Sequence, residues 1–330
     1  MGDRKIVVAN MIRWGMIGCG DVTEHKSAPA YQQTEHFELL AVSARTPGKA
    51  QDYAKRHGVP RWYTDADAMI NDPHVDAVYI ATPPDSHLEL ALKVAKANKV
   101  CCIEKPMAVN FAQSQQIHDA FLARQLPLFI AYYRRSLPGF IAVKQSLEAN
   151  EIGSIRHVQW HYNRPPSALD LSEKYNWRTD KTIAPGGYFD DLASHGIDII
   201  TFLAGNIAQA KGLCSNQQGL YSAYDGITAT AGFESGATAS MSWNFGSYEY
   251  QDSLIVHGSH GTAKLSVFSD EHVTITNESG ITTIAMPKPT PIQSHFVADL
   301  SNHLLNKVSH PSQGNSALHT SWVMDEILKC

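Results

Sequence analysis

Residues 12–25, IRWGMIGCGDVTEH, decide the fold, because an apolar run ends at two glycines and a helical stretch follows at once. In a dinucleotide-binding unit the first glycine, here Gly18, makes the tight turn, and the second, Gly20, lets the backbone approach a pyrophosphate. The helix that starts at Asp21 and Val22 then offers amide donors and partial positive charge. An ordinary strand–turn–helix has the same pattern, so the surrounding sequence must decide between the two.

The surroundings favour the nucleotide-binding interpretation. Apolar runs of strand type alternate with helical patterns, as in parallel sheets with crossover helices. The runs are FELLAVSA (37–44), AVYIAT (77–82), VCCIE (100–104) and LPLFIAYY (126–133), and the helical patterns include PGKAQDYAKRHG (47–58) and DSHLELALKVAKANK (85–99). We predict a doubly wound, six-stranded Rossmann sheet over residues 1–134, with Gly58 ending one helix and Asn110 capping another.

From residue 135 the pattern changes to that of an α+β domain with a mostly antiparallel open sheet, which we expect over residues 135–330. SIRHVQWHYN (154–163) and ATASMSWNF (237–245) alternate strictly between apolar and polar side chains. The polar side of the second stretch carries no charge, although solvated sheet faces usually carry some. We therefore expect either an interface that forms a homodimer or homotetramer, or a small solvated face.

Length and charge exclude several classes of protein. A chain of 330 residues predicts two domains. A net charge of −5 leaves no electrostatic footprint for nucleic acid or an anionic membrane. No run of about 18 apolar residues exists, so no transmembrane helix is expected. Arg13 interrupts the apolar start, which argues against a signal peptide, and Met11 leads us to interpret residues 1–10 as an upstream extension.

The five cysteines are irregularly spaced and form no CxxC pair. This pattern indicates neither a disulfide framework nor a zinc site. We therefore expect free thiols and a cytoplasmic location.

The end of the second predicted strand indicates the cofactor. NAD-binding sheets place an acid there to accept from the ribose 2′-hydroxyl. This chain has Ser43, Ala44 and Arg45 instead. A guanidinium binds a phosphate through paired hydrogen bonds, so we favour NADP(H), with NAD(H) as the alternative. Arg45 as a solvated loop arginine is the competing interpretation.

Other polar residues follow the ends of two neighbouring strands. Ligands of doubly wound sheets bind at the carboxyl ends of the strands. Thr82, Pro83 and His87 follow one strand, and Glu104 and Lys105 follow the next. We expect these residues at the nicotinamide end of the crevice, with a solvated surface charge as the alternative for Lys105.

The second half supplies a possible acid–base pair on a helix that begins near Gly186 and Gly187. Asp191 and His195 are four residues apart and share a helical face. A carboxylate at this spacing holds an imidazole in one tautomer and raises its basicity, as proton transfer requires. A metal pair or a structural hydrogen bond has the same spacing. We expect no bound metal, since no third ligand is obvious beyond Asp198.

Taken together, these motifs resemble the Gfo/Idh/MocA oxidoreductases from about Ile12 to Leu328. The motifs are Gly18–Cys19–Gly20, Glu104–Lys105–Pro106, Tyr133–Arg134–Arg135, Trp177–Arg178 and Gly186–Gly187 followed by Asp191, His195 and Asp198. Thr23, in place of the third glycine, and Pro185, in place of another glycine, depart from the family pattern without removing a chemical group.

The resemblance implies roles for individual residues. Lys105 would contact the reacting hydroxyl, and Pro106 would follow a cis peptide that fixes the lysine beside the nicotinamide. His195 would be the acid–base residue, with Asp191 as its neighbour. The Trp177–Arg178 pair would lie near the cofactor, and Arg134 would lie in a hinge-side motif.

We therefore expect an NAD(P)-dependent dehydrogenase or reductase that acts on a CH–OH/C=O centre of a sugar, cyclitol or related polyhydroxylated molecule. The candidate substrate walls are Tyr162, Asn163, Arg164, Trp177 and Tyr188, together with Lys105, Asp191 and His195. The alternatives are a non-catalytic nucleotide-binding regulator of the same fold and an NAD-dependent glycosidase of the same family.

Overall fold

The computed structural model describes residues 11–172, 174–269 and 272–330. The described residues form two compact units, the first with residues 11–107, 115–133 and 289–314, and the second with residues 108–114, 134–288 and 315–330. We expected one boundary at residues 134–135. The second unit does take most of its chain from residue 134 onward, but residues 289–314 return to the first unit. The proposed extension, residues 1–10, lies outside the described residues.

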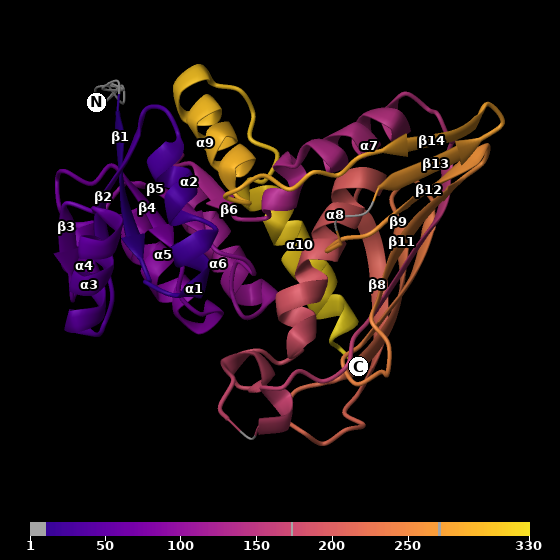
Figure 1. Ribbon diagram of the computed structural model, residues 1–330, viewed down its shortest axis with the longest axis horizontal. Coiled ribbons are helices and arrows are strands. Elements are labelled where there is room, and N and C mark those ends of the chain that lie inside the picture. The colour runs from indigo at the N-terminus through magenta and orange to yellow at the C-terminus, as the bar shows by residue number, and fades with distance from the viewer. Residues whose placement is uncertain (1–10, 173, 270–271) are drawn as a thin grey trace. The chain divides into compact units, whose positions relative to one another are not determined.

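The first unit contains the predicted parallel sheet, with strand order β3-β2-β1-β4-β5-β6 (Figure 1). Its strands are β1 (Ile12–Ile17), β2 (Phe37–Ser43), β3 (Arg61–Tyr63), β4 (Ala77–Ile80), β5 (Val100–Ile103) and β6 (Leu128–Ile130). Every neighbouring pair is parallel. The expected doubly wound sheet is therefore confirmed, and β3, which has only three residues, is the strand for which we named no sequence run.

Helices cover both faces of this sheet. They are α1 (Asp21–His25), α2 (Ala28–Gln33), α3 (Pro47–His57), α4 (Ala66–Ile70), α5 (His87–Lys96), α6 (Phe111–Leu122) and α9 (Ser294–Asn306). Trp14 and Met16 of β1 join a core that includes Tyr31 of α2 and Phe296 of α9. Gly15 between them faces Met69 of α4 on the other side. The contribution of α9 to this core explains why residues 289–314 belong to the first unit.

The two predicted helix-capping residues, Gly58 and Asn110, are confirmed. Gly58 ends α3 in the left-handed region, with φ +65°. The Asn110 side chain accepts a hydrogen bond of 2.9 Å from the Gln113 amide at the start of α6. The helical stretch expected after the glycine turn consists of two short helices, α1 and α2.

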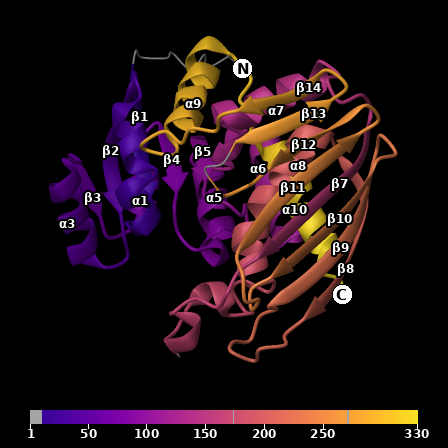
Figure 2. The same ribbon diagram turned by 45° about the vertical axis from the view of Figure 1, so that its right-hand side comes forward.

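The second unit contains an eight-stranded sheet with the order β14-β13-β12-β11-β7-β10-β9-β8 (Figure 2). Its strands are β7 (Ile155–Asn163), β8 (Ile207–Ser215), β9 (Gly226–Phe233), β10 (Thr238–Asn244), β11 (Gln251–Gly258), β12 (Gly261–Leu265), β13 (Val273–Asn277) and β14 (Gly280–Ile284). β7 and β10 pair in parallel, and the other neighbouring pairs are antiparallel. The mostly antiparallel sheet is confirmed.

Helices α7 (Pro138–Glu148), α8 (Ser194–Ala204) and α10 (Gly314–Ile327) lie on one face of this sheet (Figures 1 and 2). Gly196 permits the close approach of α8, because a Cβ there would lie 2.0 Å from the Trp160 ring of β7. The other face keeps the uncharged polar side chains of β10 and those of β7, where His157 and His161 bond Ser240 and Ser242 at 2.9 and 2.7 Å.

The cysteine prediction was wrong in one respect. Cys214 of β8 and Cys330, which follows α10, form a disulfide with a Cα–Cα distance of 5.7 Å. The end of α10 lies directly against β8, since a Cβ at Gly212 would lie 2.1 Å from the Ile327 carbonyl oxygen. The two cysteines are 116 residues apart, and only the packing of α10 on β8 makes them neighbours. Cys19, Cys101 and Cys102 are free and buried.

Candidate active site

The glycine turn of the first unit has the geometry that a dinucleotide needs. Gly18 has a φ of +107°, and a Cβ there would lie 2.6 Å from the Ala81 carbonyl oxygen, so only glycine fits. A Cβ at Gly20 would meet no atom within 4 Å, so open space lies in front of this residue. α1 begins at Asp21, which places Asp21 and Val22 in the first helical turn, as predicted. These features fit a pyrophosphate on the helix N-terminus.

Thr23 compensates for the missing third glycine. Its side chain is fully buried, and its hydroxyl donates a hydrogen bond of 2.7 Å to the Gly20 carbonyl. The Tyr53 hydroxyl donates to the Thr23 carbonyl, also at 2.7 Å. The threonine thus ties the turn to α1 and α3, and the departure from the glycine pattern leaves the turn intact.

The end of β2 lies beside this turn, because the Gly18 amide donates to the Ser43 carbonyl at 2.8 Å. Ser43 is buried, whereas Arg45 and Lys49 are exposed. Arg45 therefore follows the strand close to the position where an acid would select the ribose 2′-hydroxyl, and Lys49 follows within α3. The geometry leaves Arg45 accessible to a phosphate.

His87 connects the ends of β4 and β5. Its Nε2 lies 2.8 Å from the Thr82 carbonyl oxygen, and its Nδ1 lies 3.0 Å from that of Pro106. The Lys105–Pro106 peptide is cis, as the family resemblance implied. Burial lowers the pKa of His87. Each ring nitrogen faces a backbone carbonyl oxygen, and a neutral ring donates to only one of them. His87 therefore lies between the Thr82 and Pro106 carbonyls, while its contact with the cofactor stays a prediction.

Glu104 is likewise used inside the first unit. Its Oε1 accepts from the Tyr79 hydroxyl at 2.5 Å and from the Gln293 side chain at 2.9 Å. Its Oε2 accepts from the Lys105 amide at 3.2 Å. This carboxylate therefore fixes the backbone from which the half-buried Lys105 projects. Gln293, just before α9, carries no motif, and sequence reasoning missed it.

The predicted catalytic helix of the second unit starts irregularly. Residues Phe189–Ala193 form a π-helix, and α8 continues from Ser194. The Gly186 amide donates to Asp190 at 2.8 Å, and a Cβ on Gly186 would collide with that carboxylate at 2.6 Å. His195 is 7% exposed and meets the Phe268 ring edge-on, with centroids 6.0 Å apart. π-Helical turns are rare and often occur at functional sites.

Asp191 is bound by a residue that was predicted to lie near the cofactor. Its Oδ2 accepts a hydrogen bond of 3.0 Å from Arg178 Nε. Arg178 also stacks on the neighbouring Trp177, with its guanidinium carbon 4.4 Å from the ring centroid. Trp177, Arg178 and Asp191 therefore form one cluster, so the structure brings these three predicted residues together.

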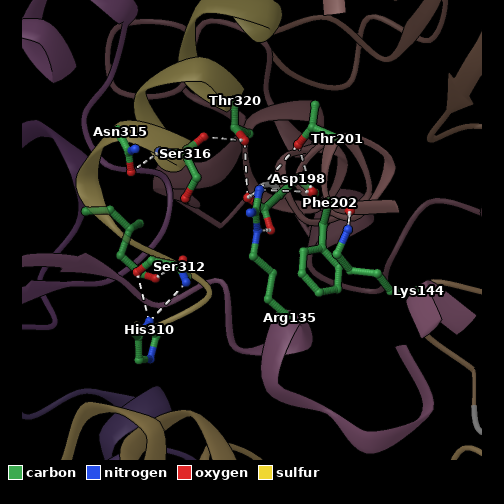
Figure 3. A network of polar contacts seen from close by, with 11 residues as sticks. Arg135, Lys144, Asp198, Thr201, Phe202, His310, Ser312, Asn315, Ser316 and Thr320 are labelled. Atoms are coloured by element: carbon green, nitrogen blue, oxygen red, sulfur yellow. Dashed lines mark hydrogen bonds and ion pairs between the residues drawn. The ribbon is translucent and has the colours of Figure 1, made fainter. Parts of the chain in front are cut away.

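Asp198 belongs to a different network from the one we considered (Figure 3). It is 1% exposed and forms a two-pronged ion pair with Arg135, with both N–O distances 2.8 Å. Thr320 of α10 also donates to it, at 3.2 Å. Burial raises the pKa of Asp198, and Arg135 opposes that rise. Asp198 therefore joins α8 to α10, which is a structural role. Among the described residues no group of three His, Cys, Asp or Glu side chains could hold a metal.

The predicted substrate walls divide into two sets. Tyr162 and Tyr188 pack in one aromatic cluster with Phe245, and burial raises the pKa of both tyrosines. Arg164 stacks on the Tyr188 ring at 4.1 Å. Asn163, next to Tyr162 on β7, lies on the opposite face of the sheet, where it bonds Gln251 at 3.2 Å.

A residue that sequence reasoning missed, Asp170, organises this region. It accepts a hydrogen bond from the Tyr188 hydroxyl and pairs with Arg164 at 3.2 Å. The Ser167 amide and hydroxyl donate to it as well, both at 2.7 Å. The only local signal is the serine three residues before the aspartate, which is typical of a turn and does not indicate a hub.

Both units match known families. Residues 12–132 match the family described as an oxidoreductase family with an NAD-binding Rossmann fold, and residues 140–264 match the GFO/IDH/MocA C-terminal domain. Oxidoreductase P35 of Formosa agariphila is 33% identical over 317 residues, which are 95% of this chain and 97% of that protein. Myo-inositol 2-dehydrogenase of Thermotoga maritima is 27% identical, over 82% and 79% of the two chains.

Solved structures share the fold. Levoglucosan dehydrogenase in complex with NADH and levoglucosan has a TM-score of 0.87 at 21% identity, with 96% of each chain covered. An Agrobacterium radiobacter oxidoreductase in complex with NAD+, L-tartaric acid and magnesium has a TM-score of 0.86 at 19% identity, covering 96% of this chain and 95% of that one.

Proposed function

The chain belongs to the Gfo/Idh/MocA oxidoreductases, and from this premise we propose that it is an NADP-dependent dehydrogenase or reductase of a sugar, cyclitol or related polyol. It is an NAD(P)-dependent oxidoreductase by its family. The observation that carries the finer proposal lies at the edge of the first unit's sheet where the strands have their carboxyl ends, which we call the crevice edge. The glycine turn follows β1 there, the exposed Arg45 follows β2, and Lys105 follows β5.

The preference for NADP(H) is supported by Arg45. It is exposed two residues after Ser43, whose carbonyl holds Gly18 of the dinucleotide turn. A guanidinium there adds charge-assisted hydrogen bonds to a 2′-phosphate, and the sequence has no Asp or Glu between Glu38 and Asp52. The solved relatives named above were crystallised with NADH or NAD+, which is the observation against this preference.

The proposed chemistry assigns separate tasks to the two units. The nicotinamide supplies the hydride acceptor or donor at its C4 atom. Lys105 would stabilise the oxyanion that develops as the substrate hydroxyl loses its proton. His195 would take that proton, and Asp191, held by Arg178, would favour the charged form of the imidazole. In the reduction direction the same proton returns from His195 to the carbonyl oxygen.

Names of relatives support the substrate class. Myo-inositol and levoglucosan, named in two of the relatives, are both polyhydroxylated rings. A screen of purified protein with sugars, cyclitols and diketones, read by nicotinamide absorbance with each of the four nucleotide forms, tests the proposal. Turnover on at least one polyol or its ketone supports it. Nucleotide binding without turnover on any compound would instead support a regulator, and a nucleotide that co-purifies and does not exchange would support a glycosidase.

We also propose that the polar face of the second unit's sheet joins two or more copies of the chain. The face carries cross-strand hydrogen bonds between β7 and β10 at His157 and His161, without a charged group on the facing side of β10. The β10 part of this face carries no charge, so it can meet its own copy without like-charge repulsion. Light scattering should show a dimer or tetramer for the wild type and a smaller species for Ser242→Arg; an unchanged mass would reject this face.

The cytoplasm remains our proposed location. Among the described residues, no helix has the length and apolar character to span a membrane. The Cys214–Cys330 disulfide is the observation against a reducing compartment, where such bonds are rare. Alkylation of thiols in intact cells, followed by mass analysis, decides the question: two alkylated thiols at these positions fit the cytoplasm, and a protected pair contradicts it.

A further inference from the structure

A cavity of about 330 Å³ opens in the second unit beside the turn that carries Arg178. Asp170 lies among its lining residues, and the segment from Lys174 to Asp180 supplies several of the others. Small-molecule pockets begin at about this volume, which suits a single sugar ring. None of the motifs singled out in the sequence explains this cavity.

The polar residues Asp170 and Asn176, which we call the floor of the cavity, already have hydrogen-bond partners within the unit. Asp170 is 9% exposed, and its two oxygens together accept hydrogen bonds from Tyr188, Arg164 and Ser167. Asn176 donates to the Tyr188 hydroxyl at 3.0 Å and accepts from the Arg178 amide at 3.2 Å. Because these groups already hydrogen-bond one another, they shape the cavity, and the residues at its rim would make the contacts that recognise a ligand.

The rim combines an aromatic ring with charged and apolar groups. Tyr175 is 72% exposed, and Leu169 and Leu220 are 41% and 42% exposed. Asp180 uses Oδ1 to accept from Thr182 at 2.9 and 2.7 Å, while its Oδ2 lies 3.5 Å from the Tyr175 hydroxyl. A contact of that length is weak, so Oδ2 keeps capacity to accept from a ligand hydroxyl.

This combination fits a neutral polyhydroxylated ring better than other ligands. A sugar has C–H faces that pack on an exposed aromatic ring, and hydroxyls that pair with carboxylate oxygens and a lysine. Asp170 and Asp180 disfavour a phosphate or another strong anion. A purely apolar molecule is disfavoured by the rim, because it would remove Asp180 Oδ2 and Lys174 from water without giving them a partner, which costs free energy.

The cavity shares a wall with the candidate catalytic cluster. Asn176 and Thr179 line the cavity, and Arg178 between them bonds Asp191 at 3.0 Å. We propose that the cavity binds a second sugar ring, so that the substrate is a glycoside or disaccharide of which one ring is oxidised or reduced. The proposal rests on the function proposed above, because it names the substrate class of the same enzyme.

The test compares one sugar with its disaccharides. The probes are glucose, cellobiose and maltose, and binding is measured by ligand-observed NMR in the presence of saturating NADP+ or NADPH. We expect at least one disaccharide to bind wild-type protein about tenfold more tightly than glucose, since an aromatic platform and one ring of contacts contribute on that scale. Tyr175→Ala should abolish this difference, and Tyr175→Phe should keep it.

Tyr248→Ala is the matched control, because Tyr248 is 95% exposed and does not line the cavity. It should leave the preference unchanged. Equal affinity for glucose and both disaccharides, or a disaccharide preference that survives Tyr175→Ala, overturns the second-ring site. Failure of the proposed function has a different signature: nucleotide-dependent turnover is then absent for every compound, whether or not disaccharide binding responds to Tyr175.

Discussion

The crevice edge of the first unit and the Asp191 region of the second are held in place by different means. At the crevice edge the backbone does most of the positioning: Gly18 has no room for a Cβ, and its amide bonds the carbonyl of Ser43. Around Asp191 side chains do it: Arg178 donates to Asp191, and Tyr188, three residues earlier in the chain, donates to Asp170. A site built on backbone geometry depends on few local residues, whereas a site built on side-chain networks depends on residues scattered along the chain.

This difference predicts where function and stability can be separated. Side chains at the crevice edge that point away from the core should affect chemistry or cofactor choice alone. Buried polar side chains in the second unit should affect the fold and the site together.

The largest effect is expected for Lys105→Ala, which removes a side chain at the carboxyl end of β5. Losing the charge that stabilises the oxyanion should lower kcat about 10² to 10⁴-fold, while nucleotide affinity stays nearly intact. Steady-state kinetics on a substrate found by the screen, together with a nucleotide titration, measure both quantities.

Lys99→Ala is the matched control, because Lys99 precedes the same strand at its other end and donates to the Asp72 carbonyl at 2.7 Å. It should leave kcat unchanged. A Lys105→Ala enzyme that retains normal turnover would remove Lys105 from the mechanism.

The next effect is on stability, at the Arg135–Asp198 pair of the second unit. Arg135→Met leaves a buried carboxylate without its partner, which typically costs about 3 to 5 kcal/mol. Urea unfolding should show the loss, and the double variant Arg135→Met with Asp198→Leu should recover much of it. A loss of less than about 1 kcal/mol in the single variant would mean that the pair contributes little.

The same contrast explains what the sequence could and could not predict. The glycine turn, the Gly58 and Asn110 caps, and the alternation of strands and helices are local, so pattern and propensity were enough. The return of residues 289–314 to the first unit, the Asp170 cluster and the Cys214–Cys330 pair arise from tertiary packing between distant segments. No spacing rule in a single sequence identifies such partners.

Removing the disulfide tests one of those long-range links. Cys214→Ser opens a loop of 116 residues and should lower the free energy of unfolding by about 2 to 4 kcal/mol. Wild-type protein treated with dithiothreitol should lose the same amount, and the variant should lose nothing further. Unequal losses by the two routes would mean that the serine, and not the missing bond, causes the change.

The smallest effect is expected on the free energy of unfolding as pH falls. This prediction concerns one histidine in each unit. His303 Nδ1 accepts from the His310 amide and His319 Nε2 from the Ile207 amide, both at 3.1 Å, so both rings must be neutral there. Burial lowers the pKa of both. The folded state then binds fewer protons than the unfolded chain, so stability is complete above an unfolded pKa of about 6.5 and declines as pH falls below it.

Urea unfolding at a series of pH values measures this decline. His303→Gln and His319→Gln should each reduce the slope below pH of about 6.5, whereas exposed His272→Gln should not. Identical slopes in all four proteins would show that neither buried ring titrates on unfolding.

The central claim is that the crevice edge binds a nicotinamide nucleotide and reads its 2′-phosphate through Arg45. The most direct measurement is a fluorescence titration of wild type and Arg45→Ala with NADPH and, separately, NADH. We predict tighter binding of NADPH by the wild type, and about 10- to 100-fold weaker NADPH binding with little change for NADH in the variant. Equal losses for both nucleotides, or a wild-type preference for NADH, would contradict this account of the cofactor site.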